Sequence, residues 1–88
     1  MNDELAEKIE TQMFRYYDLD FCIQSMQFVK EENGFSHYAL TGLNDDFEFY
    51  IDLLVKFRLI NDKIIDFYVH DGKNYIEPTT TLEQQETR

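Results

Sequence analysis

The 88-residue chain lacks tryptophan and has one cysteine, one proline and three glycines. A single cysteine, Cys22, excludes an intrachain disulfide, and the sequence has no Cys/His spacing typical of zinc sites. We expect this thiol to be buried. The three glycines form no Gly-rich phosphate-binding loop, and without that loop or a zinc spacing we expect neither cofactor nor metal. A long apolar run and a signal-peptide pattern are also absent, which favours a cytoplasmic protein away from membranes.

Basic residues are scarce as well. The chain has 18 acidic and 8 basic residues, a net charge of −10. A field of this sign repels nucleic acid and anionic lipid and steers basic proteins toward the chain. Solubility alone would explain the same charge equally well.

The clearest pattern runs from Phe47 to His70. Every odd position from 47 to 59 is apolar, which is the period of a half-buried strand, and the alternation resumes in residues 65–69. The two runs predict an antiparallel hairpin. A two-residue loop would mix apolar and polar faces, so we expect a loop of three or five residues. That register pairs Leu59 with Ile65, Phe57 with Phe67 and Val55 with Val69, and it places Arg58 beside Asp66.

The first half of the chain predicts a helix and a second hairpin. Apolar residues at helical spacing indicate a helix over residues 3–17, and strands are expected over 21–32 and 35–43 around Asn33-Gly34. A two-residue turn there pairs Phe28 with Ala39 and Met26 with Thr41. A three-residue loop at 44–46 then pairs Ala39 with Ile51 and Thr41 with Phe49.

The resulting architecture is α+β, with one amphipathic helix on a four-stranded antiparallel meander. It forms a single domain over residues 1–77, followed by a flexible polar tail over 78–88. The helix would cover the face with Met26, Phe28, Ala39, Thr41, Phe49, Ile51, Phe67 and Val69. The opposite face would carry Val29, Tyr38, Leu40, Tyr50, Leu54, Ile60, Ile64 and Tyr68, interrupted by Asp52, Lys56, Arg58 and Asp66.

In shape this arrangement resembles the cystatin-like folds, in which a sheet wraps around a helix. The segment Gln27-Phe28-Val29-Lys30-Glu31 is the nearest match to the Gln-x-Val-x-Gly motif of cystatin inhibitors, with Glu31 in place of the glycine. The resemblance implies an alternative function, a small-ligand carrier or degenerate enzyme of the cystatin or NTF2-like kind. That alternative requires a pocket between helix and sheet.

Acidic residues should gather at both ends of the sheet, because the turns of a meander alternate between its ends. One end would hold Asp18, Asp20, Asp45, Asp46 and Asp71, and the other Glu31, Glu32 and Asp62. The simplest interpretation is solvated hairpin tips. A second is a surface that imitates nucleic-acid phosphates, and a third is a divalent-cation site at the first end, although no EF-hand spacing supports it.

Catalytic residues are hard to find. His37, expected on the helix-covered face near Leu53, and His70 lie on different strands without a nucleophile motif, so we expect no enzyme. The exposed Tyr38, Tyr50, Leu54 and Tyr68 are instead typical of a protein interface. We therefore expect a protein-binding module that inhibits a basic or nucleic-acid-handling protein, as nucleic-acid mimics, phage anti-defence proteins and immunity proteins do. A homodimeric subunit joined through the sheet is a further alternative.

Overall fold

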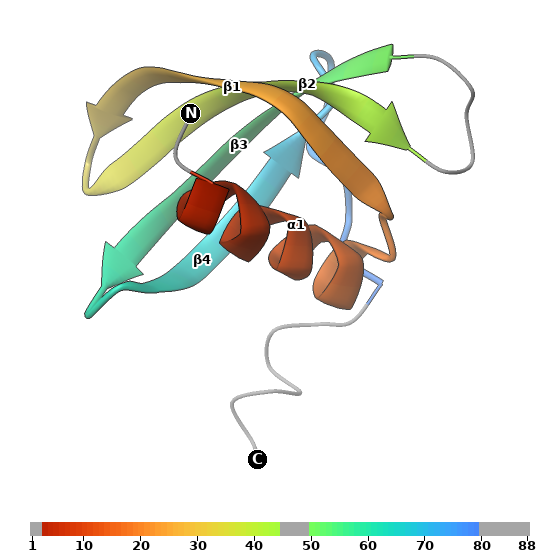
Figure 1. The fold of residues 1–88 in the computed structure, drawn as a ribbon. Coiled ribbons are helices and arrows are strands. Elements are labelled where there is room, and N and C mark those ends of the chain that lie inside the picture. Colours follow the sequence, from red (N-terminus) through yellow and green to blue (C-terminus); the bar gives the residue numbers. More distant parts are fainter. Residues whose placement is uncertain (1–2, 45–49, 80–88) are drawn as a thin grey trace.

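The computed structural model describes residues 3–44 and 50–79 and contains one helix and one sheet (Figure 1). The elements are α1 (Asp3–Tyr17), β1 (Phe21–Glu32), β2 (Phe35–Asn44), β3 (Tyr50–Ile60) and β4 (Lys63–His70). All neighbouring strands are antiparallel, in the order β1-β2-β3-β4, and α1 lies across one face of the sheet. The predicted α+β meander with one helix is confirmed.

Residues at the two ends of α1 explain where the helix begins and ends. Asp3 and Glu4 lie in its first turn, where negative charge compensates the helix dipole. The helix ends after Tyr17 because Asp18 adopts a left-handed conformation (φ 53°), and the Leu19 N–H donates to the Met13 carbonyl at 3.1 Å. This is a C-cap that glycine usually forms. An aspartate in that position explains why the helix end has only a weak signal in the sequence.

The core fills the space between α1 and the sheet. Ile9 and Met13 from the helix meet Phe57 and Val69 from the sheet, and all four side chains are fully inaccessible to solvent. Rings also cross the sheet, one from each element, with centroids 5.5–6.1 Å apart; in order they are Phe28, Tyr38, Phe57, Phe67 and Tyr17. Such a row adds aromatic contacts to the apolar burial that holds helix and sheet together.

The sheet curves around the helix, and its two edge strands lie nearest to α1. Register shifts interrupt β1 twice, between Ile23 and Ser25 and between Phe28 and Lys30. A third interrupts the β3–β4 pairing, where Asp66 has φ 52°. Bulges increase the twist and bend of a strand. Their position in both edge strands therefore lets the sheet wrap around one helix.

The β3–β4 turn differs from the prediction. It is a two-residue turn at Asn61 (φ 52°) and Asp62 (φ 67°), the positive φ values of a type I′ turn, and it pairs Leu59 with Ile64 instead of Ile65. The turn thereby places Ile64 against the core, and not on the opposite face as predicted. The bulge at Asp66 then restores the predicted pairing of Val55 with Val69. As predicted, Arg58 lies beside Asp66, with 3.8 Å between Nε and Oδ2.

The β1–β2 register is confirmed only near its turn. Glu32 pairs with Phe35 across Asn33-Gly34, as the two-residue turn requires. The bulge at Val29 then shifts the ladder by one residue, so Phe28 pairs with Tyr38 and not with Ala39. Beyond it Ser25, and not Met26, pairs with Thr41.

The predicted β2–β3 register is wrong. Among the described residues the outermost pair is Leu43 with Tyr50, and Ala39 lies opposite Leu54 instead of Ile51. This odd shift exchanges the faces of β2. Leu40 is therefore 1% exposed in the core, and Tyr38 stacks on Phe57. The residues that move to the face away from α1 are His37, Ala39 and Thr41.

Three predictions fall on residues outside the described ranges: the strand positions Phe47 and Phe49, the acids Asp45 and Asp46, and most of the tail. Within the described part, residues 71–77 fold back along β4, where the Ile76 N–H donates to the Val69 carbonyl at 2.8 Å. The Thr79 N–H then donates to the Tyr16 carbonyl, also at 2.8 Å, beside the end of α1. No helix among residues 3–44 and 50–79 is long and apolar enough to cross a membrane.

Candidate functional site: the uncovered face of the sheet

We call the face of the sheet opposite α1 the uncovered face, because none of the described helices or strands lies over it (Figure 1). Its central strand, β3, presents alternate residues, from Tyr50 through Leu54 to Ile60. Large apolar side chains on this face are well exposed: Tyr50 60%, Leu54 43%, Ile60 52%, Ile65 37%, Tyr68 38% and Tyr75 55%. Of the four side chains predicted to form an interface on this face, Tyr50, Leu54 and Tyr68 lie exposed on it, whereas Tyr38 lies on the other face and stacks on Phe57.

One half of the uncovered face is an aromatic cluster around a cation. The ammonium of Lys56 lies 4.9 Å, 5.4 Å and 5.2 Å from the ring centroids of Phe35, Tyr68 and Tyr75. The Arg58 guanidinium lies 4.6 Å from the centroid of Phe35. These contacts hold two positive charges against rings at the surface. The sequence prediction missed the cluster because the wrong β2 register separated its members; with the correct pairing, alternation alone places Phe35, Lys56 and Tyr68 together.

The other half carries negative charge around a hollow. Thr41 Oγ1 donates to Asp52 Oδ1 at 2.7 Å, and the Asp71 carboxylate accepts the backbone N–H groups of Asn74 and Lys73 at 2.9 Å and 2.8 Å. The bonds from Asn74 and Lys73 lower the pKa of Asp71, which keeps it ionised. The hollow has a volume of about 360 Å³. Its lining combines the two carboxylates with a mainly apolar surface from Ala39, Leu40, Thr41, Leu53, Leu54 and Gly72.

Acidic side chains lie at both ends of the sheet, and at one end two of them form ion pairs. Glu32 lies 3.2 Å from Lys30, and Asp62 lies 2.8 Å from Lys8, so we call this end the compensated end. Exposed acids at the opposite end are Asp18, Asp20 and Asp71. The prediction placed Asp45 and Asp46 there as well, outside the described residues. Glu31, the remaining predicted acid, is exposed near the compensated end.

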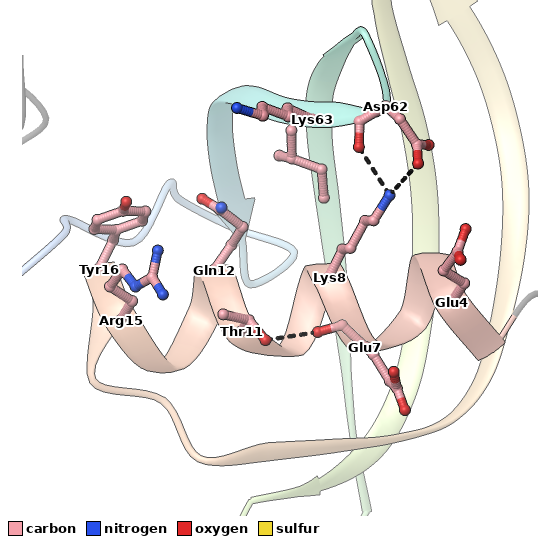
Figure 2. Close-up of a pocket in the computed structure, with 10 residues that line it drawn as sticks. Glu4, Glu7, Lys8, Thr11, Gln12, Arg15, Tyr16, Asp62 and Lys63 are labelled. Carbon is pink, nitrogen blue, oxygen red and sulfur yellow. Dashed lines mark hydrogen bonds and ion pairs between the residues drawn. The ribbon is translucent and has the colours of Figure 1, made fainter.

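A second hollow lies on the outer side of α1, against the β3–β4 turn (Figure 2). Lys8 Nζ bridges it, with 2.8 Å to both the carboxylate and the carbonyl oxygen of Asp62. The lining has both signs of charge, with Glu4 and Glu7 on one side and Arg15 and Lys63 on the other. This hollow does not give the pocket that the ligand-carrier alternative needs, because Ile9 and Met13 beneath α1 are fully inaccessible to solvent.

Residues with catalytic or metal-binding chemistry are scattered. His37 lies on the uncovered face opposite Lys56, not on the helix-covered face as predicted. His70 Nδ1 accepts the Gly72 N–H at 3.0 Å, and its ring contacts Tyr75. Cys22 is exposed, which corrects the expected buried thiol. Within residues 3–44 and 50–79, no group of three or more His, Cys, Asp or Glu side chains could hold a metal ion.

Comparison of the chain with protein-family models, with curated proteins and with solved structures gives no match. We therefore infer the function from the geometry of this chain.

Proposed function

We propose that this protein is a non-enzymatic protein-binding module whose interface is the uncovered face of the sheet. The observation that carries the proposal is the set of large apolar side chains exposed on that face, from Tyr50 and Leu54 to Tyr68 and Tyr75. A monomeric soluble protein rarely leaves so many together without a partner. Tyrosine is also among the residues that contribute most to protein interfaces.

The partner presents lysine or arginine side chains to the acidic half of the face. The hollow between Asp52 and Asp71 combines an apolar lining with two carboxylates. A long basic side chain matches both parts, since its methylene stem can lie on Leu54 while its charged end meets the carboxylates. The net charge of −10 adds long-range attraction for a basic partner.

More specifically, we propose that the protein inhibits a nucleic-acid-handling protein. The exposed acids Asp18, Asp20 and Asp71 at one end of the sheet support this form, because basic nucleic-acid clefts bind regularly placed negative charge. On the uncovered face itself, Lys56 and Arg58 interrupt the acids. We therefore assign any mimicry to that end of the sheet.

The test is a capture experiment from cell lysate at low and high salt, with captured proteins identified by mass spectrometry. The variant Asp52→Asn/Asp71→Asn removes two negative charges, while the amide oxygens can still accept the bonds from Thr41 and from the 73–74 backbone. The matched control, Glu31→Gln/Glu32→Gln, removes the same charge from the compensated end. We expect the parent and the control to capture a basic protein that is lost as salt rises, and the test variant to capture much less.

Equal capture by both variants would contradict a role for the acidic half. Equal capture by the parent and by Tyr50→Ala/Leu54→Ala would contradict the uncovered face as the interface. The circular dichroism spectrum and melting temperature of each variant, compared with those of the parent, separate a lost contact from a lost fold.

A further inference from the structure

The uncovered face is self-complementary along its central strand. The residues that β3 presents there run, in order, Tyr50, Asp52, Leu54, Lys56 and Arg58. An acid and an aromatic ring lie on one side of Leu54, and two cations lie on the other. If a second copy of β3 ran in the opposite direction, its Lys56 would face Asp52 and its Arg58 would face Tyr50.

The neighbouring strands follow the same order. Ala39, Leu54 and His70 form one row across β2, β3 and β4, as the pairing shows. On one side of that row Thr41 pairs with Asp52, and on the other His37 and Tyr68 flank Lys56. The central row contains a methyl group, an isobutyl group and an imidazole, so it has no fixed charge that would meet its own copy across a symmetry axis.

We propose that a second copy of this chain covers the uncovered face, related by a twofold axis that crosses the strands above Leu54. The inference rests on the proposed function and names the partner for the same surface, with Lys56 and Arg58 as the basic side chains that this partner presents. In this arrangement the two β3 strands lie antiparallel. Asp52 then faces Lys56 of the second copy, Tyr50 faces Arg58 of the second copy, and the two Leu54 side chains meet at the axis.

On the uncovered face itself, charge complementarity favours a second copy over a uniformly basic protein, while the net charge of −10 on each copy opposes their approach at long range. A basic partner would satisfy Asp52 and Asp71 but would press positive charge against Lys56 and Arg58 on the other half of the face. A twofold contact instead satisfies both halves, and each favourable contact occurs twice. The Lys56 ammonium is already held among three rings, so little side-chain freedom is lost when it meets an acid.

The size of the face sets the expected strength. From strand spacing and rise, a four-stranded face ten residues long measures about 600 Å². A standard interface buries about 800 Å² per partner. We therefore expect a weak dimer that requires measurement at high protein concentration.

The experiment is sedimentation equilibrium of the purified parent chain, of Asp52→Lys, of Lys56→Asp, and of an equimolar mixture of the two variants. Each variant alone would place like charges opposite each other at two points of the interface. We expect each to weaken self-association by about 100-fold or more. In the mixture, an Asp52→Lys chain can face a Lys56→Asp chain with every cation at these positions opposite an acid, so we expect dimers to return.

A second pair of variants guards against changes in the fold. Leu54→Lys places two cations at the axis without touching the aromatic cluster, and it should abolish the dimer. Leu54→Met keeps the apolar contact and should retain it. Both should melt at nearly the parent temperature, because Leu54 is 43% exposed in the single chain.

A parent chain that stays monomeric at every concentration would overturn the second copy as the partner. So would a dimer that none of these substitutions weakens, or a mixture of the two charge variants that stays monomeric. This outcome is distinct from failure of the proposed function. If the parent is monomeric but captures a basic protein, and Asp52→Asn/Asp71→Asn does not, the uncovered face is still the interface and only its partner differs.

Discussion

The two faces of the sheet use aromatic rings in different ways. On the face covered by α1, rings contact rings, and the row ends at Phe67 and Tyr17 against the helix. On the uncovered face, Phe35, Tyr68 and Tyr75 surround a lysine instead. The first arrangement removes apolar area from water, whereas the second leaves a charge at the surface in a fixed position.

The difference separates the face that folds the chain from the face that we propose binds a partner. With 88 residues the chain can cover only one face of the sheet with its single described helix, so that face must supply most of the folding energy. The uncovered face contributes less to folding and keeps its side chains available. Substitutions on the two faces should therefore separate stability from association.

The largest difference in stability is expected when one aromatic residue on each face is replaced by alanine. Phe57 is fully inaccessible and stacks between Tyr38 and Phe67, so Phe57→Ala should lower the free energy of unfolding by about 3–5 kcal/mol. Tyr50→Ala removes a ring of similar size from the uncovered face and should change it by less than about 0.5 kcal/mol. Urea unfolding at low protein concentration measures both. Similar losses would contradict the division of roles between the faces.

The next effect concerns backbone approach on the covered face. A Cβ at Gly42 would overlap the Cys22 carbonyl oxygen and lie 2.9 Å from two atoms of the Phe21 ring. Gly42→Ala should therefore force β1 and β2 apart and cost about 1–3 kcal/mol. Thr41→Ala, one residue earlier on the uncovered face, removes only the exposed bond to Asp52 and should cost less. Thermal unfolding by circular dichroism compares them, and a stable Gly42→Ala variant would show that the strands can separate freely.

A smaller difference in stability between the two faces is expected when one tyrosine hydroxyl is removed from each. The buried Tyr17 hydroxyl donates to the Phe67 carbonyl at 2.9 Å, so Tyr17→Phe should cost about 1 kcal/mol. Tyr68→Phe, on the uncovered face, is the matched control and should cost less. Denaturant unfolding at neutral pH measures both.

The Tyr17 hydroxyl should also make the free energy of unfolding depend on pH. Burial, followed by the nearby Tyr68, raises the pKa of Tyr17 above its ordinary value of 10.0. The folded state therefore holds this proton more tightly than the unfolded chain. Its contribution is complete below about pH 10 and is lost as the pH rises through the folded-state pKa. The stability difference between parent and Tyr17→Phe should narrow above about pH 10, and a constant difference would contradict the assignment.

The sequence predicts the elements of this fold well because each has a local signal. Helical spacing marks Asp3–Tyr17, Asn33-Gly34 marks the first hairpin, and strict alternation marks β3. The helix, the strands and the order of the strands follow from these signals. The exposed Tyr50, Leu54 and Tyr68 follow as well, because they lie where alternation is strongest.

The registers could not be predicted, because they depend on bulges and loop lengths without a local signal. The bulges at Val29 and Asp66 involve ordinary residues, and the β2–β3 pairing, which sets Ala39 opposite Leu54 instead of Ile51, differs from the one that alternation favours. One odd shift places Leu40 in the core, packs Tyr38 against it and brings His37 to the uncovered face. The aromatic cluster around Lys56 could not be predicted without this register, since it requires side chains from three strands and a loop.

The smallest effect tests one of those unsignalled features, the turn that sets the faces of β4. Asp62 has φ 67°, a conformation that costs a non-glycine residue about 1 kcal/mol. Asp62→Gly should relieve this cost and lose the exposed ion pair with Lys8, which contributes about 0.5 kcal/mol. We expect a net stabilisation of about 0.5 kcal/mol. Lys8 can still donate to the residue 62 carbonyl, 2.8 Å away in the parent.

Lys8→Met is the control, since it removes the ion pair and leaves the turn unchanged. Unfolding of Asp62→Gly, Lys8→Met and the parent in denaturant separates the two contributions. Both variants lack the ion pair, so an Asp62→Gly variant that is less stable than Lys8→Met would contradict a backbone cost at Asp62. If Asp62→Gly is more stable than the parent, relief of the left-handed backbone at residue 62 outweighs the loss of the ion pair, and the turn that sets the faces of β4 does not depend on that pair.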